Sequence, residues 1–138
     1  MAEERFSLEP DIAEIPRLVA WVERCCGAAG LDSGAAFHLA LALDEAVTNV
    51  ISYAFVGEAP PHRVEVRLEI AAETVTATVV DNGRSFDPSA PPAPHVSAPL
   101  EERTPGGLGI LLMHRMVDRV EYRRSGSQNH LRLEKSRS

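Results

Sequence analysis

The chain has 138 residues, of which 44% are hydrophobic and 25% are charged, and its formal net charge is -6. This length suits one domain with a sizeable core, and the composition is that of a soluble folded protein rather than a disordered or fibrous one. An acidic surface repels DNA, RNA and anionic lipid, which argues against sequence-independent binding to these polyanions. We therefore expect a single domain over residues 1–138, with no direct nucleic-acid or membrane partner.

The sequence predicts a cytoplasmic protein without a structural metal. No apolar run approaches the roughly 20 residues of a membrane span, and the N-terminal segment lacks the apolar core of a signal peptide. Cys25 and Cys26 are adjacent in a helical pattern, which suits reduced thiols better than a structural disulfide. The five histidines show no metal-ligand spacing, so a zinc site is not expected.

One strand and two helices are predicted in the first part of the chain. Residues 4–9 alternate weakly before a proline, which predicts a short first strand. Asp11 is the expected N-cap of an amphipathic helix that glycines end near residues 27–30. Ser33 is the expected N-cap of a longer helix, which runs to about residues 53–55.

The remaining segments complete an α+β fold. Residues 64–70 alternate strictly between apolar and charged side chains, which predicts a half-buried strand, and residues 74–80 predict its hairpin partner. A helix after Gly106 and a closing hairpin across Gly126 follow. This order indicates a two-layer sandwich, in which helices cover one face of a mixed, mostly antiparallel sheet and the other face is polar. Residues 88–105 contain six prolines and no apolar period, which indicates a lid.

Glu45 and Asn49 form the first candidate for a chemical site. They are four residues apart in a predicted helix, so they share one helix face. The Glu45 carboxylate can orient or deprotonate a water or hydroxyl group, and the Asn49 carboxamide offers a neutral oxygen ligand to Mg²⁺. Taken alone, such a pair is more often two solvated side chains, so other elements have to support it.

A second candidate follows the apolar strand that ends at Asp81. A carboxylate at a strand end can accept a hydrogen bond from an adenine amino group, and Gly83 lets the backbone pass close to a flat base. Taken alone, Asp-Asn-Gly is also simply a favourable turn.

The third candidate is the stretch Gly106-Gly107-Leu108-Gly109 before a helical pattern. Free backbone N–H groups and the helix dipole favour phosphate at such a start, although helix entry after a loop often uses glycine as well. The stretch is neither a P-loop nor a Rossmann fingerprint, because it lacks the Gly-Lys-Ser/Thr end of the first and the strand–glycine–helix order of the second.

Together, the three candidates resemble one known family. Residues 43–49 (LDEAVTN), 81–88 (DNGRSFDP) and 106–110 (GGLGI) stand in the order found in the GHKL, or Bergerat, ATPase superfamily. Within it, the chain resembles the short bacterial anti-sigma-factor serine/threonine kinases, over about residues 6–133. The resemblance implies the two-layer GHKL sandwich with ATP and Mg²⁺ as cofactors.

The resemblance also implies roles for individual residues. Asn49 would ligate Mg²⁺, Glu45 would be the general base, and Asp81 would read the adenine amino group with Gly83 against the base. Such roles suit phosphoryl transfer, which depends mostly on positioning and charge neutralisation.

The glycine-rich helix start and the lid complete the implied nucleotide site. Gly107, Leu108 and Gly109 would hold phosphate oxygens through the backbone. Arg103 in the lid would add positive charge near the γ-phosphate, although most loop arginines are simply solvated.

Two departures from the family pattern concern the adenine end. Ser85 stands where many GHKL members have the second glycine of Asp-x-Gly-x-Gly. The last strand, around residues 130–133, lacks the threonine that often supports the adenine-binding aspartate. Thr74, Thr76 and Thr78 are the candidate substitutes if the sheet places them nearby.

The resemblance implies an ATP-dependent protein serine kinase with two protein partners. It would phosphorylate a small anti-anti-sigma antagonist and, as a homodimer near its first strand and helix, sequester a sigma factor. The alternative is a non-catalytic, ATP-gated binding module of the same fold; Glu45 favours the kinase, because a module that only binds nucleotide needs no base. The ATPase part of a histidine kinase is disfavoured, because the chain has no room for a dimerising helical hairpin.

Overall fold

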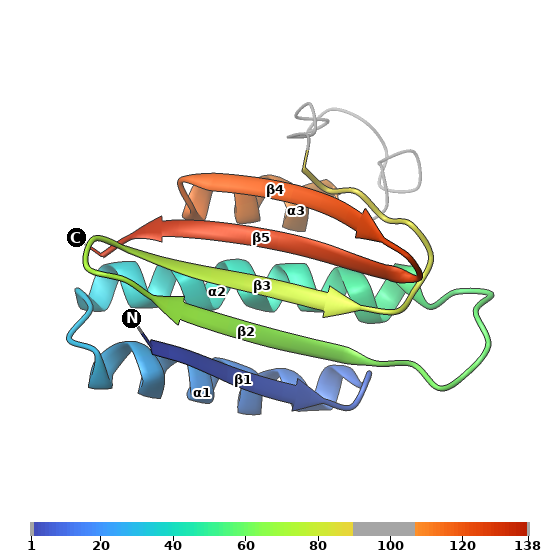
Figure 1. Cartoon of the computed structure of the whole chain (residues 1–138), viewed down its shortest axis with the longest axis horizontal. Helices are drawn as coiled ribbons and strands as arrows, with labels where there is room; N and C mark the ends of the chain where they lie inside the picture. The colour runs from blue at the N-terminus through green and yellow to red at the C-terminus, as the bar shows by residue number, and fades with distance from the viewer. Residues whose placement is uncertain (1, 90–106, 138) are drawn as a thin grey trace.

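The computed structural model of the chain describes residues 2–89 and 107–137 (Figure 1). Five strands form one sheet in the order β1-β2-β3-β5-β4. The strands are β1 (Ala2–Leu8), β2 (Val64–Ile70), β3 (Thr74–Asp81), β4 (Arg119–Ser125) and β5 (Gln128–Ser136). The predicted α+β fold is confirmed, but the sheet is not mixed, because every pairing between these strands is antiparallel. Hairpins supply the β2–β3 and β4–β5 pairs, and a hairpin makes its two strands antiparallel.

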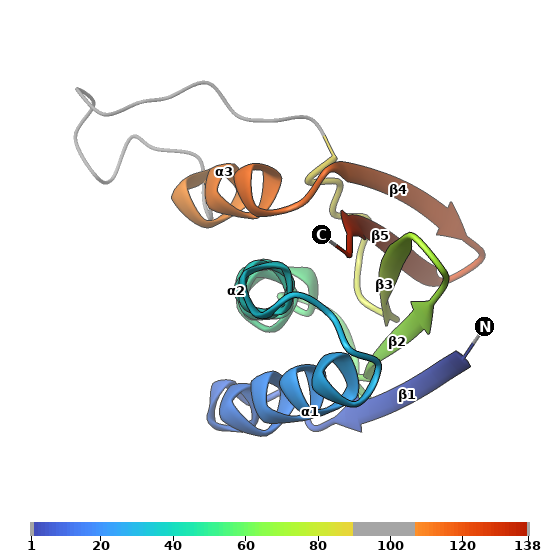
Figure 2. The same ribbon diagram turned by 90° about the vertical axis from the view of Figure 1, so that its left-hand side faces the viewer.

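Three helices cover one face of this sheet, as Figure 2 shows. They are α1 (Ile15–Ala28), α2 (Ser33–Asn49) and α3 (Gly107–Met116). The core lies between the two layers, and its largest fully buried side chains include Leu18, Leu39, Leu43, Leu68, Met113 and Leu133. Alternate β2 residues point into this core, so the strict alternation in the sequence corresponds to a strand with one buried face.

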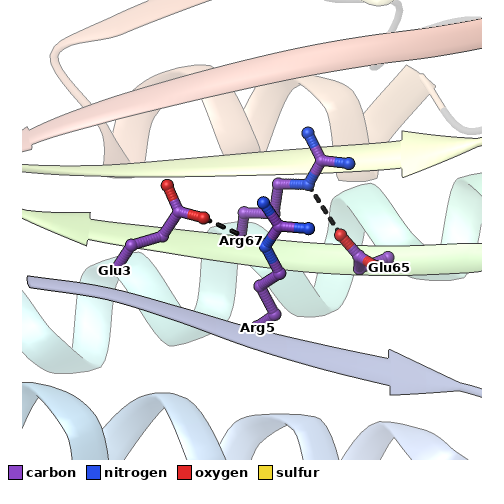
Figure 3. A network of polar contacts seen from close by, with 4 residues as sticks. All are labelled: Glu3, Arg5, Glu65 and Arg67. Carbon is purple, nitrogen blue, oxygen red and sulfur yellow. Dashed lines mark hydrogen bonds and ion pairs between the residues drawn. The ribbon is translucent and has the colours of Figure 1, made fainter.

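The other face of the sheet is polar, as predicted. Neighbouring strands present charged side chains there, and Figure 3 shows four of them. Arg5 Nε lies 3.0 Å from Glu3 Oε1 on β1, and Arg67 Nε lies 2.6 Å from Glu65 Oε1 on β2. Solvated pairs of this kind contribute little to stability, so the core on the opposite face dominates the folding free energy.

The helix starts agree with the predictions in one case and differ in the other. Asp11 caps a short 3₁₀ turn, Ile12–Glu14, by accepting a hydrogen bond from the Ala13 N–H at 2.9 Å, and α1 follows directly. The N-cap of α2 is Asp32 and not Ser33: Asp32 Oδ2 accepts from the Ala35 N–H at 3.1 Å. Both residue types cap helices well, and the carboxylate stands in the position that reaches the N3 amide.

The end of α2 changes its winding. After Asn49 the chain continues as a π-helix, η2 (Val50–Ala54). At the last residue of this π-helix, the Ala54 carbonyl accepts a hydrogen bond from the Arg84 N–H at 2.8 Å. The π-helix therefore joins the end of α2 to the loop after β3, which carries one of the candidate motifs.

Other expectations concern the cysteines, metals and membranes. Cys25 and Cys26 are free thiols, as expected, and burial raises the pKa of Cys26 to about 11. Within residues 2–89 and 107–137, no group of three or more His, Cys, Asp or Glu side chains could hold a metal ion. No helix in that same part of the chain is long and apolar enough to cross a bilayer. Nearly all of the predicted lid, including Arg103, lies outside the described residues.

Candidate nucleotide site

The first part of the site is the contact between α2 and the start of α3. Glu45 and Asn49 lie one turn apart on α2, and Gly109 of α3 packs directly against them. A Cβ atom at Gly109 would lie 2.7 Å from Glu45 Oε2 and 3.9 Å from Asn49 Nδ2. The missing side chain of Gly109 therefore lets the first turn of α3 approach a carboxylate and a carboxamide.

Asn49 is buried with an incomplete set of hydrogen bonds. Asn49 is only 6% exposed, and its Nδ2 atom has no hydrogen-bond partner among the described residues. An unpaired buried amide destabilises a fold by about 1–3 kcal/mol, so such groups usually mark a place completed by something else. The unpaired N–H of Nδ2 can donate to a phosphate oxygen, and the carboxamide oxygen is a neutral ligand of the kind that Mg²⁺ accepts.

The carboxyl group of Glu45 has a raised pKa, so it is a weaker acid than an ordinary glutamate. Burial raises the pKa of its carboxyl group, and the neighbouring carboxylate of Asp44 raises it further. A higher pKa makes the ionised form a stronger base, which suits acceptance of a proton from a hydroxyl group. This carboxylate lies beside Gly109, at the first turn of α3.

The start of α3 carries the remaining phosphate candidates. Gly107, Leu108 and Gly109 form its first turn, and Leu108 is 52% exposed. The first N–H groups of a helix have no partner within the helix, so this turn presents free donors. Farther along α3, His114 Nε2 donates to the Pro88 carbonyl at 2.7 Å and ties the helix to the segment after β3.

The second part of the site surrounds Asp81 at the end of β3. Asp81 is only 4% exposed, and its Oδ1 accepts hydrogen bonds from the Gly83 N–H at 2.8 Å and from Asn129 Nδ2 at 2.9 Å. Burial raises the pKa of Asp81, whereas the bonds from Asn129 and Gly83 oppose that increase. Oδ2 has no hydrogen-bond partner in the described part of the chain, so it is the oxygen left to accept from a ligand.

Gly83 brings the loop after β3 onto the end of α2. A Cβ atom at this position would lie 2.5 Å from the Ala54 carbonyl oxygen, which is closer than real side chains approach. The rings of Tyr53 and Phe86 stack nearby, with centroids 6.1 Å apart. The sequence predicted that Gly83 would let the backbone pass close to a flat base. In the structure, Gly83 lets the loop pass close to the backbone of Ala54.

Asn129 is the site residue that sequence reasoning missed. It stands directly opposite Asp81 in the β3–β5 register. Thr74, Thr76 and Thr78 cannot replace it, because they alternate with the buried residues of β3 and point to the other face of the sheet. One signal could have identified Asn129: it shares the period-two positions of Leu131 and Leu133, so a strand there places it on the buried face.

A family comparison decides what this arrangement is. Residues 8–135 match the histidine kinase-like ATPase domain family. The chain belongs to that family. This confirms, at the level of the family, the resemblance inferred from the three motifs, and membership of an ATPase family implies ATP binding.

Individual relatives of this histidine kinase-like ATPase domain agree with the assignment. It is 33% identical over 97 residues to the serine/threonine-protein kinase BtrW of Bordetella bronchiseptica, covering 70% of this chain and 68% of BtrW. The solved RsbU and RsbW domains of Rv1364c from Mycobacterium tuberculosis share its fold with a TM-score of 0.69 and 16% identity. That match covers the whole of this chain, which spans about a third (34%) of the mycobacterial chain.

Histidine kinases share the fold as well. The histidine kinase domain of the blue-light activated histidine kinase EL346 from Erythrobacter litoralis matches with a TM-score of 0.58 and 18% identity. The match covers 91% of this chain and 60% of that domain. The fold alone therefore does not separate serine kinases from histidine kinases.

Proposed function

We propose that this chain, acting as a single ATPase domain, is an ATP-dependent protein serine kinase and an anti-sigma factor. It phosphorylates a small anti-anti-sigma antagonist and sequesters a sigma factor. The observation that supports the proposal is the packing of Gly109 against Glu45 and Asn49, because it brings a carboxylate and a carboxamide beside the amides of a helix start. The similarity to the serine/threonine-protein kinase BtrW supports the same reaction class.

The proposed phosphate end is built from α2 and α3. Asn49 binds Mg²⁺, and the backbone of Gly107, Leu108 and Gly109 holds phosphate oxygens. When bound, Mg²⁺ neutralises phosphate charge that develops during transfer. Glu45 accepts the proton of the attacking serine hydroxyl, which its raised pKa favours. Arg103 supplies further positive charge from the lid.

The proposed base end is Asp81 with the loop that follows it. Asp81 Oδ2 accepts a hydrogen bond from the adenine amino group, since Oδ1 is already occupied by two donors. Gly83 keeps the backbone flat against the purine, because any side chain there would displace the loop from Ala54. In this proposal, ATP is held at its phosphate end beside α2 and α3 and at its base end beside Asp81 and Gly83.

The binding part of the proposal is tested by thermal unfolding. Wild type and Asn49→Ala are heated with Mg-ATP, Mg-GTP or no nucleotide, and Thr48→Ala on the same helix is the control. A ligand at 100 times its dissociation constant adds about 2.7 kcal/mol of stability. We expect Mg-ATP, but not Mg-GTP, to raise the melting temperature of wild type and of Thr48→Ala. Asn49→Ala should lose this increase. If wild type melts at the same temperature in all conditions, it does not bind nucleotide, and the ATP-dependent part of the proposal is wrong.

The partner part of the proposal is tested separately. We propose that the protein is cytoplasmic and forms a homodimer through the surface near β1 and α1. This dimer holds the sigma factor, and the antagonist displaces the sigma factor near the lid. Scattering with and without Mg-ATP measures the oligomeric state, and a strict monomer in both conditions would contradict the dimer. Transfer of label from γ-labelled ATP to a serine of purified candidate antagonists distinguishes the kinase from an ATP-gated binding module.

A further inference from the structure

Asn129 of β5 lies at the centre of a hydrogen-bond network that joins β5 to β3 and β4. Its Nδ2 donates to Asp81 Oδ1 at 2.9 Å and to the Arg84 carbonyl at 2.7 Å. Its Oδ1 accepts from the Tyr122 hydroxyl at 2.5 Å and from Arg124 Nη1 at 3.0 Å. Only 2% of Asn129 is exposed, so all four hydrogen bonds of this carboxamide are made within the protein.

The network permits only one orientation of the Asn129 carboxamide. An arginine guanidinium has donors and no acceptor, so the atom of Asn129 that faces Arg124 has to be the oxygen. The NH₂ group then necessarily faces Asp81. Because the Gly83 N–H also donates to the same carboxylate oxygen, two donors converge on Asp81 Oδ1 and leave no place there for a proton.

Ser85 and Arg124 extend the network to the loop that faces the base. The Tyr122 hydroxyl uses its proton on Asn129, so Ser85 Oγ is the donor in its 3.1 Å contact with that hydroxyl. Arg124 Nη1 also donates to the Gly83 carbonyl at 2.6 Å. Ser85, a departure from the glycine of many family members, is thus tied to the same cluster as Asn129.

We infer that Asn129, held by Tyr122 and Arg124, is a positioning residue that makes the site select adenine over guanine. Its hydrogen bond to Oδ1 favours the ionised form of Asp81 and leaves Oδ2 as the oxygen that accepts from the ligand. Adenine presents an amino donor at C6, whereas guanine presents a carbonyl acceptor, which an ionised carboxylate repels. The inference rests on the proposed nucleotide site, and it adds to that site the residue that determines base selectivity.

The inference is tested with Asn129→Leu, which removes the carboxamide at similar volume, and with Asn129→Thr, which restores one donor. Titration calorimetry measures the affinities for the Mg complexes of ATP, GTP and purine riboside triphosphate, which has hydrogen at C6. A hydrogen bond to a charged group is worth about tenfold or more in affinity. We expect Asn129→Leu to weaken ATP about tenfold, to leave purine riboside triphosphate within about threefold, and to shrink the ATP-to-GTP ratio. Asn129→Thr should recover part of that ratio.

Tyr122→Phe provides a second test that removes a single hydroxyl from a half-buried edge-strand residue. We expect the ATP-to-GTP ratio to fall in this variant as well, but by a smaller factor of about two to five. Asn129 loses only one neutral hydrogen bond, and the other bond that is lost joins Tyr122 to Ser85. This variant keeps the inference testable if Asn129→Leu does not fold.

The outcomes separate the inference from the proposed function. If wild type binds none of the three nucleotides, the proposed function fails and the inference fails with it. If wild type binds ATP selectively but the variants weaken ATP and purine riboside triphosphate equally, the nucleotide site stands and Asn129 has only a structural role. Unchanged selectivity in both Asn129→Leu and Tyr122→Phe would also overturn the inference.

Discussion

The two ends of the candidate site differ in how far the protein satisfies its own polar groups. Around Asp81, the buried Asn129 has every hydrogen bond made, and two donors fix one carboxylate oxygen. Around Asn49, the buried Nδ2 has no partner in the described chain, and the pKa of the neighbouring Glu45 is raised by burial. The site is therefore preorganised around Asp81, the proposed base end, and incomplete around Asn49, the proposed phosphate end. The two ends should respond differently to the same kind of substitution.

The largest expected effect contrasts the two carboxylates. Glu45→Gln should lower phosphoryl transfer by about 10²–10⁴-fold, because it removes the proposed base, while Mg-ATP affinity stays within about threefold. Asp81→Asn should instead weaken Mg-ATP binding by about tenfold or more, because its amide N–H₂ would face the adenine amino group. Transfer of γ-labelled phosphate and calorimetric titration measure the two quantities. Transfer at the wild-type rate by Glu45→Gln would contradict the role of Glu45.

The next largest effect is on stability at the preorganised end. Gly83→Ala should lower the free energy of unfolding by about 1–3 kcal/mol, because the new methyl group would meet the rigid Ala54 backbone at 2.5 Å. Gly27→Ala is the matched control, since a Cβ atom there meets nothing within 4 Å. Urea unfolding of both variants measures the difference. Equal stability of the two variants would show that the loop after β3 moves aside freely.

A smaller stability change is expected at the incomplete end. Gly109→Ala should destabilise the fold by less than about 1 kcal/mol, because the methyl group would meet the end of the flexible Glu45 side chain rather than backbone. The displaced carboxylate should nevertheless weaken Mg-ATP binding or transfer. Urea unfolding with calorimetric titration tests both statements. A loss of stability as large as that of Gly83→Ala would mean that the two ends are equally rigid.

The smallest expected effect is a shift in the pH dependence of transfer. Burial and then Asp44 raise the pKa of Glu45 above its ordinary value of 4.5. Since the base acts only when ionised, the rate should rise with pH through this raised pKa and level off above it. Asp44→Asn removes the second cause, so it should move the acid limb of the pH–rate profile to lower pH. A limb that stays in place or moves to higher pH would count against Glu45 as the titrating base.

The strands show what periodicity can predict. The prediction for residues 64–70 has the same bounds as β2, because one face of this strand is buried and the other is charged, so burial and sequence alternate together. The prediction for residues 74–80 is confirmed with one added residue, Asp81. The first helix start was also predictable, since Asp11 caps the turn that leads into α1.

Local patterns could not settle choices that depend on geometry or on distant residues. Asp32 and Ser33 are adjacent cap formers, and only the path of the chain decides which side chain reaches the Ala35 amide. The bond between Asn129 and Asp81 joins residues 48 positions apart, and its existence depends on the register of β3 and β5. The approach of Gly109 to α2 depends in the same way on tertiary packing, although the glycine itself was a correct signal.

The π-helix over Val50–Ala54 has a consequence for insertions and deletions. A π-turn is equivalent to one additional residue in an α-helix, and π-bulges occur often at functional sites. Deleting one residue from this segment would restore regular winding and leave the following residues close to their present orientation, because the wide turn already absorbs one residue. Inserting one further residue ahead of Ala54 would instead turn Ala54 and each residue after it by about 100°. The Ala54 carbonyl would then face away from Arg84, which it now binds at 2.8 Å. An insertion in this segment would therefore separate the loop after β3 from the helix, whereas loss of the additional residue would not.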